Sequence, residues 1–273
     1  MNRTRDRDES TPSSINHLPF YMILGIIPAR YASTRFPGKP LIDIQGKSMI
    51  QRVYIQAKKS KSLSKVVVAT DDQRIFDHVQ KFGGEAVMTF ADHPSGTDRC
   101  FEALKKVQGD FKYVINIQGD EPFIDPSQVD LLADLLKDGR TELATLMIPV
   151  SSHEVLFDKG EVKIVMNDKM EAIYFSRSVI PAIKGIDEKE WHKHFKYYRH
   201  VGMYAYRNDI LEAITKLAPS ALEKAESLEQ LRWLENGFKI KLAVTDHDSH
   251  CIDTPEDVEK VLRLVSQKNN FHL

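Results

Sequence analysis

The chain has 273 residues, 42% of them hydrophobic and 28% charged, which is enough apolar material for a substantial core in one large domain or two small ones. Its formal net charge of −1 argues against general nucleic-acid binding, because such binding needs a basic surface that neutralises phosphates. The only two cysteines, Cys100 and Cys251, lie far apart in the sequence, which favours a reducing compartment such as the cytoplasm. No apolar run approaches the roughly 20 residues that span a bilayer, so we expect no membrane contact.

The first 21 residues are polar, of mixed charge, and lack the apolar stretch of a secretory signal. We therefore expect residues 1–21 to form a disordered tail and residues 22–273 to form a single domain. From Met22 onward, short apolar runs alternate with amphipathic stretches. The strands predicted in the first half are Met22–Ile27, closed by Pro28, then Lys65–Thr70, Glu85–Thr89, Tyr113–Ile117 and Leu143–Val150. The helices predicted there are Ser48–Lys59, Asp72–Phe82, Asp98–Val107 and Asp125–Leu136.

The second half is less regular, and no Gly/Pro/Ser-rich linker separates it from the first. Its predicted strands are Val162–Met166 and Ala172–Ser176, which form a hairpin, then His200–Tyr206 and Lys239–Val244. Its predicted helices are Asp209–Lys216, Leu228–Asn236 with a capping box of Ser227 and Gln230, and Glu256–Val265 capped by Thr254. The alternation predicts an α/β fold whose mostly parallel central sheet is flanked by helices. Such sheets bind ligands beyond the carboxyl ends of their strands.

Three cations lie on the loop that follows the first predicted strand. They are Arg30, Arg35 and Lys39, interleaved with the small residues Ser33, Thr34 and Gly38. Arginine can clamp phosphate oxygens in a bidentate manner, lysine acts as a point charge, and small residues let backbone N–H groups approach a ligand. The loop is either a polyphosphate site or a solvated basic loop, and its place at a strand end favours the first.

Carboxylates follow several predicted strands. Asp120 stands after a central strand, in the sequence Gln-Gly-Asp-Glu-Pro, where it either holds Mg²⁺ or belongs to an ordinary turn. Asp253 precedes the last helix, where it either faces Asp120 across a metal or forms part of the helix start, in which Thr254 and Asp257 can pair. Asp71 follows the second predicted strand and is a candidate contact for a nucleotide.

Further polar residues lie at or within the remaining predicted elements. The segment His93–Arg99 follows a strand and opens a helix, so it either binds a ribose or base or only caps that helix. Arg177 ends a strand and is a candidate partner for a carboxylate. Four others are either site residues or structural residues, namely His200 and Tyr204 on one strand face and Glu229 and Gln230 on a helix. The pattern His-Glu-x-x-His does not occur, which argues against a zinc site.

Several motifs in a fixed order are far more specific than any one of them. The first is IIPARYASTRFPGKPL, and the order continues through VVVATDD, HPSGTDR, NIQGDEPF, AIYFSRSVIP, YYRHVGMYAYR, ESLEQLRWLENG and CIDTPEDVE. In this order the chain resembles the 3-deoxy-D-manno-octulosonate cytidylyltransferase (CMP-Kdo synthetase) family over residues 22–265.

The resemblance implies a nucleotide-diphospho-sugar-transferase-like (Rossmann-like) fold, CTP and a 2-keto sugar acid as substrates, Mg²⁺ as cofactor, and a homodimer in lipopolysaccharide biosynthesis. The catalytic residues that it implies are Arg30, Arg35, Lys39 and Asp120, and the metal ligands are Asp120 and Asp253. The implied CTP-binding residues are Pro28, Ala29, Arg30, Ser33, Thr34, Arg35, Lys39, Asp71, Ser95, Gly96, Thr97 and Arg99. The implied sugar-binding residues are Gln118, Arg177, His200, Tyr204, Glu229 and Gln230.

The expected reaction is attack of the anomeric hydroxyl of the sugar on the α-phosphorus of CTP, with pyrophosphate as the leaving group. Three alternatives stay open. In the first, the chemistry is the same but the substrate is an 8-amino analogue of Kdo or another 2-keto sugar acid. In the second, the protein is a metal-dependent glycosyltransferase, although such enzymes commonly use Asp-x-Asp and this chain offers Asp71-Asp72 and Gly-Asp-Glu-Pro instead. In the third, it is a non-catalytic nucleotide sensor.

Overall fold

The computed structural model describes residues 21–32, 36–137, 139–248 and 251–269. The tail expected over residues 1–21 therefore lies outside the described residues except for Tyr21. Three of the expected CTP-binding residues, Ser33, Thr34 and Arg35, lie outside them as well. Among the described helices, none combines the length and the apolar character that a membrane span requires.

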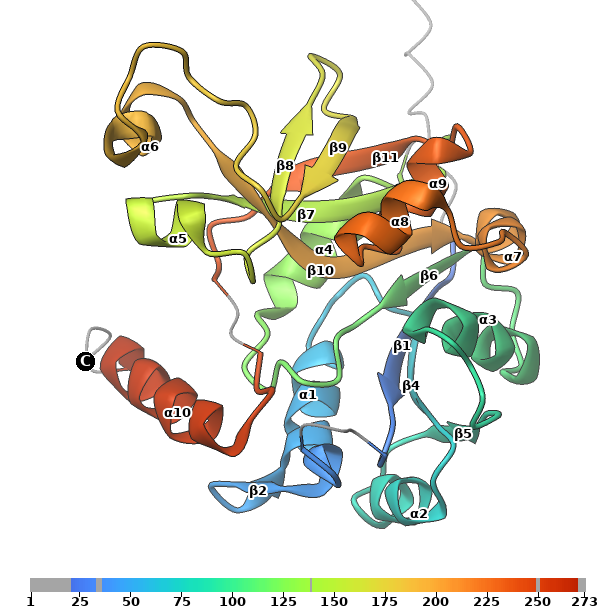
Figure 1. The fold of residues 1–273 in the computed structure, drawn as a ribbon. Helices are drawn as coiled ribbons and strands as arrows, with labels where there is room; N and C mark the ends of the chain where they lie inside the picture. The colour runs from blue at the N-terminus through green and yellow to red at the C-terminus, as the bar shows by residue number, and fades with distance from the viewer. Residues whose placement is uncertain (1–20, 33–35, 138, 249–250, 270–273) are drawn as a thin grey trace, which may run out of the picture.

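Nine strands of the described chain form one sheet, seven of them in a continuous row (Figure 1). In spatial order the row is β11 (Ile240–Val244), β7 (Leu143–Pro149), β10 (Tyr198–Arg207), β6 (Tyr113–Asn116), β1 (Ile23–Ala29), β4 (Lys65–Thr70) and β5 (Ala86–Met88). β10 pairs antiparallel with β6 and β7, whereas the other pairs in the row are parallel. All strands of the row other than β10 therefore point the same way, which confirms the expected mostly parallel sheet.

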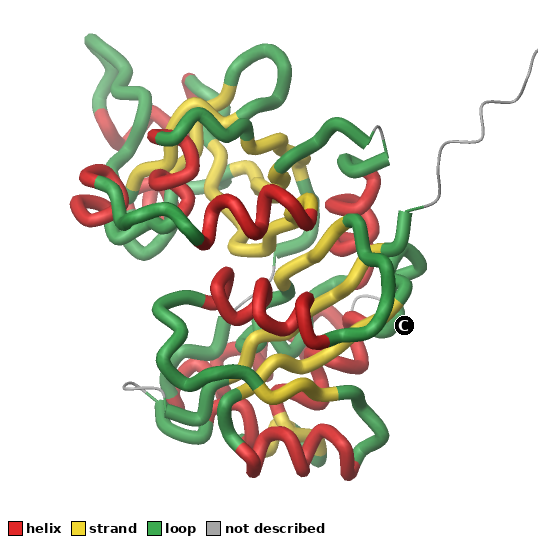
Figure 2. Tube along the Cα trace, turned by 90° about the vertical axis from the view of Figure 1, so that its right-hand side faces the viewer, coloured by secondary structure: helices red, strands yellow, loops and turns green. Residues whose placement is uncertain are grey.

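Helices cover both faces of this sheet, as Figure 2 shows from the side. The helices of one face are α1 (Met49–Ala57), α2 (Gln73–Lys81) and α4 (Pro126–Asp134), and those of the other face are α3 (Gly96–Lys106), α7 (Asn208–Thr215) and α9 (Gln230–Glu235). Ile26 and Ile27 of β1 are both fully buried but belong to different apolar cores. This division follows from the alternation of side chains along a strand, and it gives each layer of helices a core of its own.

The remaining described elements lie outside the row of seven strands and the helices that cover it. They are β2 (Asp43–Ile44), β3 (Lys47–Ser48), β8 (Lys163–Met166), β9 (Ala172–Ser176), α5 (His153–Phe157), α6 (Trp191–His194), α8 (Ala221–Glu226), α10 (Pro255–Asn269), η1 (Lys39–Leu41) and η2 (Glu188–Glu190). The sequence predicted the β8–β9 hairpin and α10. It missed the others, because elements of two to six residues show too little periodicity to be recognised.

Two predictions about element ends are wrong. β1 continues through Pro28, because a proline is compatible with an extended backbone and removes only one N–H donor from the ladder. Ser227 does not form a capping box with Gln230, because its backbone is left-handed (φ 53°) and ends α8. A capping residue at a helix start needs an extended backbone, and in this region Ser220 supplies it at the start of α8.

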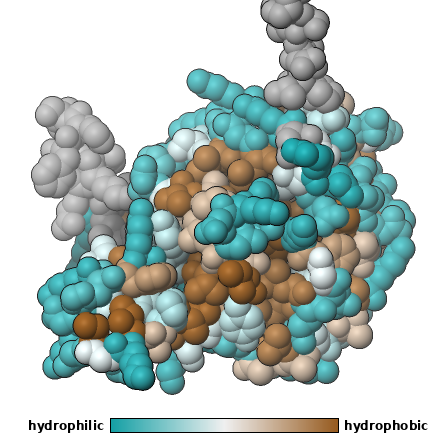
Figure 3. All heavy atoms as spheres, turned by 90° about the horizontal axis from the view of Figure 1, so that it is seen from above, coloured by the Kyte–Doolittle hydropathy of each residue, from teal (hydrophilic) through white to brown (hydrophobic). Residues whose placement is uncertain are grey.

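The β8–β9 hairpin and the arm that carries α6 extend from the same end of the molecule (Figure 1). Among the described strands, β9 pairs only with β8. Ile173 in β9 is 57% exposed, and Phe195, directly after α6, is 45% exposed. Figure 3 shows this end of the molecule, where apolar side chains gather at the surface among hydrophilic ones. A bridge between Glu171 and Lys241 joins the start of β9 to β11, so the distinctive feature of this end is its exposed apolar side chains.

β1 and β6 approach each other closely at their carboxyl ends. The N–H group of Ile117 donates to the backbone oxygen of Ile26 at 2.8 Å. A Cβ atom added at Gly119 would lie 2.6 Å from the backbone oxygen of Pro28, which is closer than real atoms of these kinds come. The position therefore requires a residue without a side chain.

We expect Gly119→Ala to lower the free energy of unfolding by about 1–3 kcal/mol, because the backbone must shift to relieve the overlap. Urea unfolding followed by circular dichroism measures this change. Gly202→Ala is a matched control, since the nearest atom to its added Cβ would be the amide nitrogen of Gln118 at 3.6 Å. Equal unfolding free energies for the two variants would contradict the close contact between the strand ends.

The ring of His200 in β10 is partly buried and contacts two neighbouring side chains. Its Nε2 atom lies 3.0 Å from Thr145 Oγ1, and its ring meets that of Phe175 edge-on with centroids 5.3 Å apart. Burial lowers the pKa of His200 to about 3. In the unfolded chain the pKa of a histidine is about 6.5, so the unfolded state binds more protons between these two values.

The free energy of unfolding should therefore fall as the pH drops from 6.5 toward 3, and His200 should account for up to about 2 kcal/mol of the loss at pH 5. His200→Gln keeps a hydrogen-bonding partner for Thr145 but does not titrate, so it should lose this part of the pH dependence. Urea unfolding of both proteins at pH 7 and pH 5 measures the difference. The same pH dependence in both would show that the ring is open to water.

Candidate active site

A pocket of about 290 Å³ opens at the carboxyl ends of β1 and β6. β4 and β5 extend the sheet on one side of β1, and β6 lies on its other side, so successive connections turn in opposite directions here. Sheets of this kind bind ligands at such a point. The described residues that line the pocket are Pro28, Ala29, Arg30, Lys39, Pro40, Ser95, Gly96, Arg99, Gln118, Gly119, Asp120 and Asp253.

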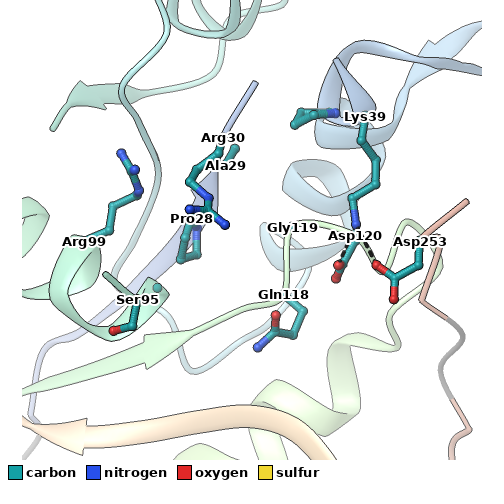
Figure 4. Close-up of a pocket in the computed structure, with 12 residues that line it drawn as sticks. Pro28, Ala29, Arg30, Lys39, Ser95, Arg99, Gln118, Gly119, Asp120 and Asp253 are labelled. Atoms are coloured by element: carbon teal, nitrogen blue, oxygen red, sulfur yellow. Dashed lines mark hydrogen bonds and ion pairs between the residues drawn. The ribbon is translucent and has the colours of Figure 1, made fainter. Parts of the chain in front are cut away.

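A lysine and two aspartates meet on one side of this pocket. Figure 4 shows the side chain of Lys39 reaching between the two carboxylates. Its Nζ atom donates to Asp120 Oδ2 at 2.9 Å and to Asp253 Oδ1 at 3.1 Å. Burial lowers the pKa of Lys39, but the two carboxylates together outweigh it, so the pKa lies above its ordinary value. Lys39 is therefore a cation held by two anions.

Backbone contacts fix the positions of both carboxylates. The N–H group of Ile252 donates to the backbone oxygen of Asp120 at 2.9 Å, and Ile252 is fully buried. A carboxylate oxygen of Asp257 accepts the N–H groups of Asp253 at 3.0 Å and of Thr254 at 2.9 Å. Asp253 therefore belongs to the start of α10, as one alternative expected, and it shares Lys39 as a partner with Asp120, whereas its role as a metal ligand stays a prediction.

The two carboxylates suit a magnesium ion. Asp120 Oδ1 is buried and has no hydrogen-bond partner in the described part of the chain. Proteins commonly hold Mg²⁺ with one or two carboxylates, while phosphates and water complete its shell. Among the described residues, no group of three or more His, Cys, Asp or Glu side chains could hold a metal by itself. A metal at this place would therefore need oxygens from a substrate.

The other side of the pocket carries groups that bind anions. Arg30 stands at the end of β1, and α3 begins at Gly96 with Ser95 as its capping residue. The first N–H groups of a helix and a nearby guanidinium both favour a negative charge.

Arg99 is a buried guanidinium at the same side, with only 1% of its surface exposed. Its Nη1 atom lies 3.2 Å from Asp71 Oδ1. Its Nη2 atom is buried without a hydrogen-bond partner among the described residues. Burial lowers the pKa of Arg99, and Asp71 opposes this shift. A guanidinium with an unused donor beside the pocket suits an oxygen of a bound nucleotide.

Glu229 contacts the start of α3. Its two carboxylate oxygens accept from Ser95 Oγ and Thr97 Oγ1, each at 3.0 Å. Burial raises the pKa of Glu229, and these two hydroxyl groups oppose the shift. Its observed contacts are thus with the expected CTP-binding segment, and its expected role at the sugar stays a prediction.

Two of the expected sugar-binding residues lie beside described cavities. Gln118 lines the pocket, and its amide donates to the backbone oxygen of Gly202 at 2.5 Å. His200 lines a second cavity of about 750 Å³. Asp253 lines both cavities, so they adjoin at this residue.

The remaining expected sugar-binding residues line neither cavity. Tyr204 and Gln230 are buried. The guanidinium of Arg177 donates to the backbone oxygens of Glu226 at 2.8 Å and Lys159 at 3.1 Å. Sugar binding by these residues stays a prediction.

The structure brings together most of the expected nucleotide site. Seven of the expected CTP-binding residues line the pocket, namely Pro28, Ala29, Arg30, Lys39, Ser95, Gly96 and Arg99. Asp71 lies behind them against Arg99, and Thr97 is buried beneath the start of α3. Pro40 and Gly119 also line the pocket but were not among the residues expected from the sequence. A glycine near a strand can mark a close approach of the backbone, and Gly119 offered that signal shortly after a predicted strand.

Comparison with known proteins agrees with this geometry. The cytidylyltransferase family matches residues 24–240. Proteins named 3-deoxy-manno-octulosonate cytidylyltransferase from Parabacteroides distasonis and Cytophaga hutchinsonii are 53% and 55% identical to this chain. These matches cover 90% and 88% of this chain and 98% and 96% of the relatives.

Solved structures show the same relationship. A structure of CMP:2-keto-3-deoxy-manno-octonic acid synthetase in complex with CTP matches with a TM-score of 0.83 and 43% identity, over 90% of this chain and 99% of that one. A 4-diphosphocytidyl-2C-methyl-D-erythritolsynthase from Anaerococcus prevotii, 13% identical with a TM-score of 0.60 over 91% of this chain and 98% of that one, shares the fold. The chain therefore belongs to the 3-deoxy-manno-octulosonate cytidylyltransferases within the cytidylyltransferase family.

Proposed function

We propose that this protein transfers CMP from CTP to 3-deoxy-D-manno-octulosonate (Kdo), with release of pyrophosphate, in a reaction that depends on Mg²⁺. The observation that carries the proposal is the meeting of Lys39 with Asp120 and Asp253 beside a cationic pocket at the ends of β1 and β6. The names of the curated relatives, and the CTP complex of the similar synthetase, support this choice of sugar and nucleotide.

In the proposed reaction, the anomeric oxygen of the sugar attacks the α-phosphorus of CTP. The bond from that phosphorus to the bridging oxygen of pyrophosphate breaks. The residues of the chain mainly position the reactants and neutralise charge. Arg30 and Arg99 would bind the nucleotide, and Lys39 would neutralise the leaving pyrophosphate. Asp120 and Asp253 would hold Mg²⁺, which when bound polarises phosphate oxygens and lowers the pKa of a coordinated hydroxyl.

The position of the second cavity suggests how the sugar acid approaches. Because Asp253 borders both cavities, a sugar in the second one lies next to the carboxylate pair. Gln118 lines the first cavity and His200 lines the second, and they are our first candidates for contact with the sugar. The 8-amino analogue of Kdo stays an alternative substrate, since a single polar side chain can distinguish a hydroxyl from an amine.

We also propose a homodimer that works in the cytoplasm in lipopolysaccharide biosynthesis. The exposed side chains of Ile173 and Phe195 support an interface at that end of the molecule. A second copy that covered this end would remove their apolar surface from water.

One assay tests the reaction, the base and the sugar together. Purified protein and Mg²⁺ are incubated with each of the four common NTPs and with Kdo, its 8-amino analogue or sialic acid, and pyrophosphate is measured. We expect pyrophosphate with CTP and Kdo, none after EDTA, and recovery when Mg²⁺ is restored. Release of a nucleoside diphosphate would instead indicate a glycosyltransferase, and binding of CTP without turnover would indicate a sensor.

Lys39→Ala should slow turnover by about 10²–10³-fold, because a cation that stabilises developing negative charge is lost. Steady-state kinetics with CTP and Kdo measure the change. Lys47→Ala is the matched control, since it removes the same charge from an exposed lysine that lines neither described cavity. Wild-type turnover in Lys39→Ala would exclude this residue from the mechanism.

A further inference from the structure

Lys39 bridges the same two carboxylates that the proposed function assigns to the metal. Its ammonium group contacts Asp120 Oδ2 at 2.9 Å and Asp253 Oδ1 at 3.1 Å. The lysine side chain is only 14% exposed, so water screens these ion pairs incompletely. The lysine therefore offsets part of the negative charge of two carboxylates that would otherwise repel each other.

An ammonium group and a divalent cation cannot both lie between these oxygens. Mg²⁺ binds oxygens at about 2.0–2.1 Å, and a bridging ammonium within a few ångströms of it would be strongly repelled. The carboxylates cannot move apart easily, because Ile252 and Asp257 hold their backbones. Lys39 can move, because its charge sits at the end of a flexible four-carbon stem.

The cationic side of the pocket offers the lysine a second set of partners. Arg30 and the start of α3 at Gly96 line the same pocket as Lys39. A triphosphate bound by these groups therefore lies within the cavity that Lys39 borders. Its oxygens carry the negative charge that an ammonium group released by the carboxylates needs.

We propose that Lys39 is an internal counter-ion that competes with Mg²⁺ for Asp120 and Asp253, and that the triphosphate of the nucleotide draws it away and so allows the metal to bind. The proposal rests on the proposed metal-dependent function. It makes metal and nucleotide binding mutually dependent, because each ligand favours the arrangement in which Lys39 has left the carboxylates.

Direct measurement of metal binding tests the proposal without reference to turnover. Equilibrium dialysis with Mn²⁺ as the probe is performed on nucleotide-free wild type and on Lys39→Met, which keeps the length of the side chain and removes its charge. We expect Lys39→Met to bind Mn²⁺ about tenfold more tightly, within the range of 5–150-fold that such couplings commonly show. CTP should raise the affinity for Mn²⁺ less in the variant than in wild type. A sample of CTP without protein serves as the blank, because CTP itself binds Mn²⁺.

Matched variants locate the effect. Lys47→Met makes the same change in net charge at an exposed position and should bind Mn²⁺ like wild type. Lys39→Arg keeps the cation and should stay weak. Adding Asp120→Asn to Lys39→Met should abolish the gain, and a gain that survived would place the metal elsewhere and overturn the proposal. Urea unfolding checks that each variant folds, and Lys39→Gln replaces Lys39→Met if that variant does not.

The outcomes separate this proposal from the proposed function. Suppose that wild type binds Mn²⁺ when CTP is present, but that in the absence of CTP the neutral Lys39 variants bind Mn²⁺ no more tightly than wild type does. The counter-ion role is then overturned, and the proposed function stands. If no protein binds Mn²⁺ even with CTP, both are overturned.

Discussion

The N–H group of Ile252 donates a hydrogen bond to the backbone oxygen of Asp120. This bond joins the segment before α10 to the loop that follows the central strand β6. Without this contact, the segment that carries Asp253 would be attached mainly through a small apolar cluster that includes Ile44, Met49 and Val261. That cluster also contains Ile252 and holds α10 against α1 and β2. The backbone contact links the residue before Asp253 directly to Asp120, and Lys39 then pairs with both carboxylates.

The charges of the site are arranged as two opposed groups. Lys39 lies between two anions at one side of the pocket, and Arg30 and Arg99 stand at the other. Each group carries a net charge, and a net charge is costly to bury without a partner of the opposite sign. Each group is therefore suited to a ligand of the opposite charge. A metal–triphosphate carries both signs, and it therefore matches the pocket better than a simple anion or a bare cation.

The sequence was informative where the signal is local. The β-branched run Lys65–Thr70 was predicted with the bounds that the structure shows, and Arg30, Lys39 and Asp120 were recognised from their places after strands. It was uninformative where packing decides. Ser220 and Ser227 both begin a Ser-x-x-Glu/Gln pattern, yet only the first caps a helix, because the chain turns at the second.

Distance along the chain limited the prediction of the site in the same way. Lys39 and Asp253 are 214 positions apart, and no local pattern shows that they touch. The contacts of Arg177 and Tyr204 likewise depend on neighbours that only the folded chain supplies. Candidate residues could thus be named from the sequence, whereas their grouping around two adjoining cavities could not.

The reversed direction of β10 affects which of its residues can meet a ligand. Tyr198, at its beginning, pairs with Pro149, at the end of β7, so β10 starts at the edge of the sheet where its neighbours finish. Early residues of this strand, such as His200 and Gly202, border the second cavity, while Arg207 pairs with Tyr113 at the opposite edge. An insertion just before β10 would therefore remodel the substrate-facing rim, and one just after it would alter only the remote side of the molecule.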